Sequence, residues 1–116
     1  MLSIPASVKI YLALDFCDMR KGYGGLYSIV QEQLKSDPKS GNLFLFTNKR
    51  RNRLKILYCD QTGVWLLSKR LDKGQFSWPV GLNGNNGKLN LSARAMALLL
   101  EGVDLKDGMK KAWYEA

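Results

Sequence analysis

The sequence predicts an α+β fold, a single small domain in which one mainly antiparallel sheet of four to five strands packs against two helices. Three observations predict it. Short apolar runs joined by short loops fill residues 42–71, two other segments carry apolar side chains at helical spacing, and no internal repeat is found. The 116 residues fit one domain (1–116), and 46% hydrophobic content is enough for a core.

The first two elements are a strand and a helix. Val8–Leu14 is apolar enough for a mostly buried strand with one solvated face. The following segment, Gly22 to Lys35, is a predicted helix that Pro38 and its neighbours stop. Its apolar positions repeat at the spacing of one helix face: Leu26, Ile29, Val30 and Leu34.

The middle of the chain predicts an antiparallel meander. Its three strands are Asn42–Thr47, Arg53–Cys59 and Val64–Leu71, each separated by a short polar turn. We expect Gln75–Trp78 to add a short edge strand that Pro79 closes.

The last third predicts a loop, a helix and a tail. Gly81–Lys88 is rich in Gly and Asn, as loops are. Ser92 is a suitable N-cap for a helix through Glu101, and Gly102 stands where a C′ glycine is expected. The domain proper covers about residues 5–105, and we expect the charged tail 105–116 to fray.

Composition excludes several enzyme classes. The chain has no histidine, which removes Ser-His-Asp and Cys-His arrangements and every His-containing zinc site. Cys17 and Cys59 are too few for a Cys₄ site and are expected to be small buried residues in a reduced compartment. No signal peptide or 18-residue apolar span is visible, so we expect a cytoplasmic protein without membrane contact or cofactor.

A metal-dependent nuclease is the catalytic alternative to this interpretation, because converging carboxylates can hold Mg²⁺. The candidates are scattered and lack a paired-carboxylate-plus-lysine pattern: Asp15, Asp18, Asp60 and Asp104. Asp60 is better explained as a turn residue and Asp104 as a helix-end residue. We therefore expect no catalytic residue and no metal site.

The net charge of +8 is concentrated in the meander. Eight basic and two acidic residues lie between Lys49 and Lys73, so this segment carries six of the eight net positive charges. Antiparallel pairing brings the tip Lys49–Arg53 close to Lys69–Arg70, making one basic surface that attracts polyanions. A solvated hairpin end is the alternative. Aromatic residues in the same stretch are either stacking faces for bases or core: Tyr58, Trp65, Phe76 and Trp78.

A second basic cluster opens the first helix. Arg20 and Lys21 precede Gly22, and exposed amides at a helix start favour phosphate. No GxxxxGK[ST] motif is present. In the alternative interpretation Asp18 caps the helix and the glycines allow close packing on the sheet.

Six motifs in order resemble the small accessory protein of the insertion-sequence-66 family, called Orf2 or TnpB in that family. The resemblance spans roughly residues 5 to 105. At the end of the 53–59 strand many members have a Trp-Trp-Asp-like sequence, whereas this chain has Tyr58-Cys59-Asp60. The matching residues are Asp18-Met19-Arg20-Lys21-Gly22 with Gly25-Leu26; Asp37-Pro38 with Ser40-Gly41; Leu43-Phe44-Leu45-Phe46; Arg53 to Tyr58 with Asp60 and Gly63; Lys69-Arg70-Leu71, Gly74, Phe76 and Trp78-Pro79; and Leu99 to Asp104.

The resemblance implies a bacterial accessory protein of DNA transposition, encoded beside a larger transposase that does the strand chemistry. We expect a non-catalytic protein that binds DNA. The alternative is a subunit that docks on the transposase or a sibling accessory protein, with exposed Phe76 and Trp78 as anchors. The residues expected to contact phosphates are Lys49, Arg50, Arg51, Arg53, Lys55, Lys69 and Arg70, with Arg20 and Lys21 as a second contact.

Overall fold

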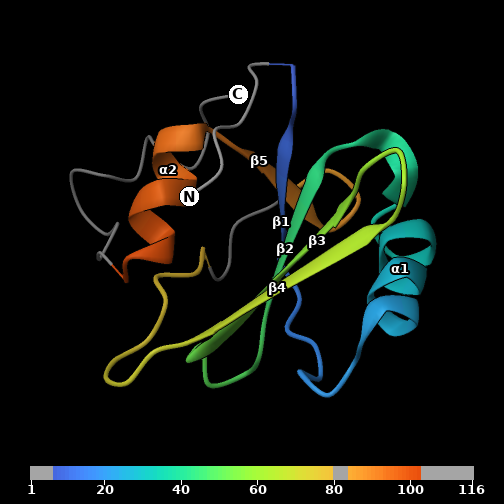
Figure 1. The fold of residues 1–116 in the computed structure, drawn as a ribbon. Helices are drawn as coiled ribbons and strands as arrows, with labels where there is room; N and C mark the ends of the chain where they lie inside the picture. Colours follow the sequence, from blue (N-terminus) through green and yellow to red (C-terminus); the bar gives the residue numbers. More distant parts are fainter. Residues whose placement is uncertain (1–6, 80–83, 103–116) are drawn as a thin grey trace.

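A computed structural model describes residues 7–79 and 84–102 and confirms the α+β fold. A five-stranded sheet runs in the order β4-β3-β2-β1-β5, and the two helices lie on opposite sides of it (Figure 1). The elements in chain order are β1 (Ile10–Ala13), α1 (Tyr23–Glu32), the 3₁₀ turn η1 (Pro38–Ser40), β2 (Leu43–Thr47), β3 (Arg53–Cys59), β4 (Val64–Arg70), β5 (Lys88–Leu91) and α2 (Ala93–Leu100).

The predicted meander is confirmed, since β3 pairs antiparallel with both β2 and β4. Its register places Arg53 directly opposite Arg70, so the turn between β2 and β3 does meet the end of β4. The sheet is mixed, because β1 pairs parallel to β2 and antiparallel to β5. The connection between β1 and β2 contains α1, as a parallel pair requires a crossover.

Each face of the sheet has its own apolar core. On one face, Leu26 and Val30 of α1 pack with Phe44 and Phe46 of β2. On the other face, α2 packs with the alternate side chains of the same strands. Every residue of β2 is buried, which explains why its first four residues, Leu43 to Phe46, are an unbroken apolar run.

The fifth strand is not where the sequence predicted it. Gln75–Trp78 forms no strand, because Phe76 and Trp78 turn into the core on the α2 side, 1% and 5% exposed. The Trp78 indole nitrogen donates to the carbonyl oxygen of Ala13 at 2.9 Å, which satisfies the one polar atom it buries. The actual fifth strand is β5, at the end of the segment predicted as a loop.

The ends of α2 follow from local chemistry, whereas α1 is shorter than predicted. The Oγ of Ser92 accepts from the backbone amide of Ala95 at 3.0 Å, and Gly102 follows α2 with φ +79°, so both predicted caps are confirmed. Helix α1 ends at Glu32, earlier than predicted, and Lys35 adopts φ +51°. The predicted tail 105–116 and Asp104 lie outside the described residues. Within residues 7–79 and 84–102, neither helix is long and apolar enough to cross a membrane.

Candidate nucleic-acid interface

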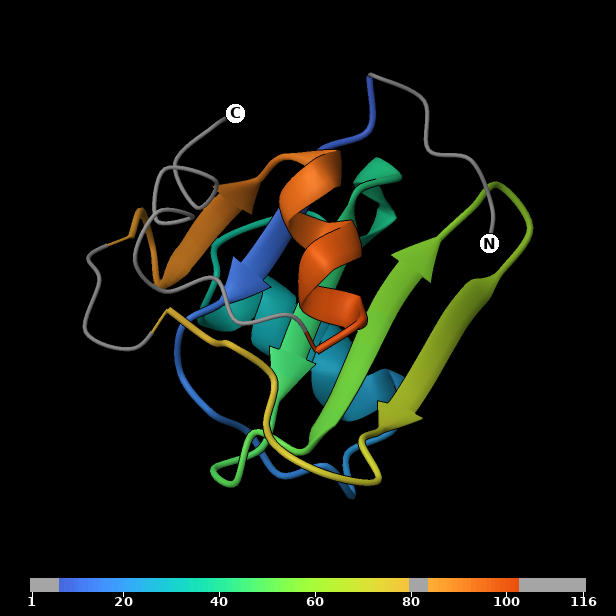
Figure 2. The same ribbon diagram turned by 90° about the vertical axis from the view of Figure 1, so that its left-hand side faces the viewer.

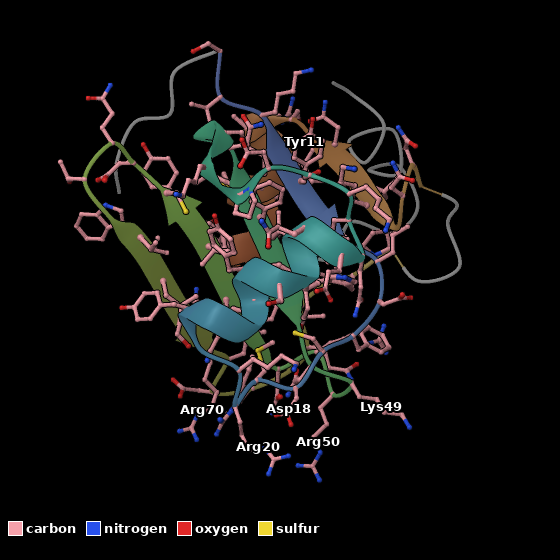
Figure 3. All side chains as sticks on the ribbon, turned by 90° about the vertical axis from the view of Figure 1, so that its right-hand side faces the viewer. Tyr11, Asp18, Arg20, Lys49, Arg50 and Arg70 are labelled. Carbon is pink, nitrogen blue, oxygen red and sulfur yellow. The ribbon has the colours of Figure 1, made fainter. Side chains whose placement is uncertain are left out.

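Four arginines brought from different parts of the chain line one surface hollow of about 520 Å³. Arg20 precedes α1, Arg50 belongs to the β2–β3 turn, Arg53 begins β3 and Arg70 ends β4. Figure 3 shows Arg20, Arg50 and Arg70 at one end of the molecule, with Asp18 among them. The remaining lining residues are Cys17, Asp18, Met19, Asn48 and Asn52.

The two asparagines hold the β2–β3 turn in shape. The Asn48 carboxamide oxygen accepts from the amides of Asn52 and Arg53 at 3.1 and 3.2 Å, and its nitrogen donates to the Asn52 side-chain oxygen at 2.8 Å. The Gln75 side chain donates to the carbonyl of Arg50 at 2.9 Å. These bonds fix the backbone from which Arg50 and Arg53 project. Sequence reasoning missed them, although Asn at both ends of a basic run is a recognisable turn signal.

Arg53 and Arg70 are paired across strands with the same charge. They occupy one register position on the α1 side of the sheet, and both are exposed. Neither has a carboxylate within ion-pair distance among residues 7–79 and 84–102. Like charges directly opposite each other in a sheet are destabilising. An anion bound between them would offset that repulsion.

Arg20 is held by an adjacent carboxylate. Its Nη2 lies 2.6 Å from Asp18 Oδ2, and its Nε donates to both carboxylate oxygens at 3.0 and 3.1 Å. These hydrogen bonds lower the pKa of Asp18 to about 2 and raise that of Arg20. The carboxylate therefore stays ionised and offsets one of the four positive charges in the hollow. The Arg20 side chain remains 91% exposed at its rim.

Two of the predicted phosphate contacts hold the fold together through their ammonium groups. Lys55 donates to the carbonyl of Lys21 at 2.8 Å and so ties β3 to the start of α1. Lys69 donates to the carbonyl of Leu100 at 2.6 Å, at the end of α2. Because neighbouring residues of a strand point to opposite faces, Lys69 lies on the other side of the sheet from Arg70.

The other predicted contacts surround the hollow without lining it. Lys49 is exposed at the turn beside Arg50 (Figure 3). Arg51 is half-buried with φ +57°, and its buried Nε has no hydrogen-bond partner. Lys21 is exposed and its backbone carbonyl accepts from Lys55.

The start of α1 differs from the capping interpretation. Gly22 is the N-cap and no side chain caps the helix, so the prediction that Asp18 caps it is wrong. Asp18 instead bonds to the amide and guanidinium of Arg20. The glycines do not pack on the sheet either. A Cβ on Gly25 would meet the Lys21 side chain at 3.1 Å, and one on Gly24 would meet open space.

Of the four aromatic residues predicted as stacking faces or core, Trp65 is exposed and the other three are buried or half-buried. Phe76 and Trp78 are buried, so the prediction that they are exposed interface anchors is wrong. Tyr58 is half-buried against the α2-side core. Trp65 is 51% exposed on β4, and its indole nitrogen donates to Asp60 at 2.9 Å.

The Cys17 thiol and the Asp60 carboxylate are groups of types that often carry catalysis. Cys17 lines the hollow, whereas Asp60 follows the opposite end of β3. Burial raises the pKa of the Cys17 thiol to about 11, so it stays protonated near neutral pH. Asp60 is the predicted turn residue, since its carboxylate accepts from the amides of Thr62 and Gly63, both at 2.8 Å. Within the described ranges 7–79 and 84–102, no cluster of three or more His, Cys, Asp or Glu residues is placed to hold a metal ion.

Fold and site together define a small α+β protein with an arginine-lined hollow at one end of its sheet. The chain belongs to the IS66 Orf2-like family: the family model described as "IS66 Orf2 like protein" (TnpB_IS66) matches residues 8–110. This membership supports an accessory role in insertion-sequence transposition.

Two relatives from Sinorhizobium fredii show the same similarity along most of their length. The "Uncharacterized protein y4hO" is 38% identical over 104 residues, which cover 90% of this chain and 88% of that protein. The "Uncharacterized protein y4jC" is 34% identical over 104 residues, covering 90% and 86%. No solved structure matches the chain.

Proposed function

We propose that this protein is a non-catalytic accessory factor of insertion-sequence transposition that binds the phosphate backbone of DNA. One observation carries the proposal: arginines from three separate segments line one hollow, namely Arg20, Arg50 with Arg53, and Arg70. Basic residues that serve only to solvate the surface would have no reason to line one hollow together. The concentration of positive charge in the meander supports the same conclusion.

The chemistry of the hollow suits phosphodiesters. Each guanidinium is permanently charged and presents a planar fork of donors that matches two phosphate oxygens. Phosphate binding would also offset the repulsion between Arg53 and Arg70. Contacts of this kind position a protein on DNA without reading its sequence. The proposed binding is therefore sequence-independent.

The chemistry of strand transfer is left to the larger transposase in this proposal. The chain contains no histidine, and the thiol that lines the hollow is neutral at physiological pH. Both facts support a binding role. Incubation of the purified protein with plasmid and Mg²⁺ or Mn²⁺ tests it, and we expect the plasmid to stay intact; nicking that co-purifies with the protein would contradict a non-catalytic role.

Fluorescence anisotropy with a labelled duplex tests DNA binding. Terminal-repeat and random duplexes of equal length are titrated side by side over a range of salt concentrations. We expect the two to bind equally and to weaken together as salt rises. A strong preference for the terminal repeat would show base readout and contradict the proposed mode.

The alternative function is docking on the transposase or a sibling accessory protein. The two residues predicted as its interface anchors, Phe76 and Trp78, are buried and cannot contact a partner. Co-purification with the transposase at high salt, without DNA, is the result that would favour it.

A further inference from the structure

The outer strand β4 combines an open edge with exposed apolar side chains. It is the end strand of the sheet that residues 7–79 and 84–102 form, and it contains no proline or glycine (Figure 2). Val64, Trp65 and Leu67 are 40%, 51% and 45% exposed. Proteins usually protect such an edge with proline, a bulge or inward-pointing charges. Here the basic residues are confined to one end, at Lys69 and Arg70.

Two backbone hydrogen bonds fix which backbone groups face outward. The amide of Leu71 donates to the carbonyl of Asn52, and the amide of Asp60 donates to the carbonyl of Gly63, both at 2.9 Å. Residues 63 and 71 therefore face β3, and so do the odd-numbered residues between them, because backbone direction alternates along an antiparallel strand. The outward amides and carbonyls are those of Val64, Leu66, Ser68 and Arg70.

We infer that β4 is a homodimer interface, at which the strand pairs antiparallel with β4 of a second copy to make one sheet continuous through both. The register that uses all seven residues places Leu67 opposite Leu67 of the second copy. Ser68 then faces Leu66 of the second copy, and Arg70 faces its Val64. Each of these pairs joins two outward-facing residues, so the ladder closes with about eight backbone hydrogen bonds.

The charges favour a second copy in this orientation. Antiparallel pairing sends the two basic ends in opposite directions, so Lys69 lies opposite Trp65 and Arg70 opposite Val64, and no basic residue faces its own equivalent. A parallel pairing would bring Lys69 and Arg70 against the same residues of the other copy.

The dimer is independent of DNA binding. The dyad stands perpendicular to the sheet, so both hollows lie on the same face at opposite ends of the joined strands. Arg70 of one copy is then about 20 Å along the strand from Arg70 of the other. An experiment that refutes the dimer does not refute DNA binding, and the reverse also holds.

Cysteine cross-linking tests the register. Across the dyad, residues at position 67 form a non-hydrogen-bonded pair with Cα atoms about 4.5 Å apart, within disulfide range. In the proposed register the Ser68 positions of the two copies are about 8 Å apart, beyond that range. Under mild oxidation in 1 M salt, after nuclease treatment, we expect Leu67→Cys to form a covalent dimer and Ser68→Cys to form no covalent dimer on a non-reducing gel. Cross-linking of Ser68→Cys in preference to Leu67→Cys would overturn the register.

Sedimentation equilibrium tests the dimer itself, again in 1 M salt and after nuclease treatment. We expect the wild-type chain to have twice its monomer mass of 13.1 kDa at 100 μM or below. Leu67→Lys sets two charges against each other at the dyad and should raise the dimer dissociation constant at least tenfold. Gln31→Lys, the same added charge on the exposed part of α1, should leave it unchanged. A wild-type monomer at 100 μM, or a transposase complex that Leu67→Lys abolishes while the chain alone stays monomeric, would overturn the proposal.

Discussion

Removing three positive charges from the hollow should sharply weaken DNA binding. The variant replaces Arg50, Arg53 and Arg70 with glutamine, which keeps much of each side chain and leaves Arg20 in place. Each phosphate contact contributes about −0.9 to the slope of log K against log salt, or roughly eightfold in affinity at 0.1 M relative to 1 M. The triple variant should therefore lose about 2.7 units of slope and roughly 500-fold in affinity at 0.1 M salt.

A control with the same net charge separates the hollow from overall electrostatics. Arg94, Lys35 and Lys39 are exposed and lie outside the hollow, so their triple replacement with glutamine also lowers the charge by three. Anisotropy with a random duplex is measured for both variants between 0.05 and 0.5 M salt, with circular dichroism as a check on folding. Equal losses in the two variants would refute the assignment of binding to the hollow and leave only non-specific attraction.

Three further predictions concern individual charges. Asp18→Asn removes the negative charge from the hollow and should strengthen duplex binding a few-fold, whereas Asp60→Asn, at the opposite end of β3, should not; equal effects would contradict the local account. The pKa of Asp60 is lowered to about 2 by hydrogen bonds from Trp65, Thr62 and Gly63, so its stabilisation is present above the ordinary value of 3.8 and lost as pH falls through 2. The urea midpoint should fall over that window, less steeply in Asp60→Asn, and identical profiles would count against these bonds. Arg70→Thr ends the like-charge pair with Arg53 and should raise the free energy of unfolding by about 0.2–1 kcal/mol while weakening DNA binding. A loss of stability in urea unfolding would show that the pair is not repulsive.

Local sequence patterns predicted those strands in which the order of apolar and polar residues matches the order of buried and exposed positions. The bounds of β3 agree with the prediction at both ends, because apolar residues alternate with charged ones and polar turns flank them. Strand β5 was missed because it has four residues beside a run of Gly and Asn, and its pairing with β1 is a long-range contact. The alternation of Phe76 and Trp78 with polar residues predicted a strand that does not form. These two side chains are buried by tertiary packing on the α2 side of the sheet instead.

The candidate site was predictable as a segment but not as a set of side chains. Charge counting located the basic meander, and antiparallel pairing correctly brought Arg53 to Arg70. The prediction placed Lys69 and Arg70 on one basic surface. Adjacent residues of a strand point to opposite faces of the sheet, so only Arg70 lies on the face of the hollow. The contribution of Arg20 to the same hollow depends on how the chain before α1 folds back toward the β2–β3 turn, and no local pattern carries that information.

The salt dependence of wild-type binding to a random duplex tests the proposed function most directly. The three arginines of the hollow that are not paired with Asp18 predict a slope of log K against log salt of about −2.7, or steeper where Arg20, Lys49 and Lys21 add contacts. A slope near zero, or no binding at 0.05 M salt, would contradict DNA binding through this surface.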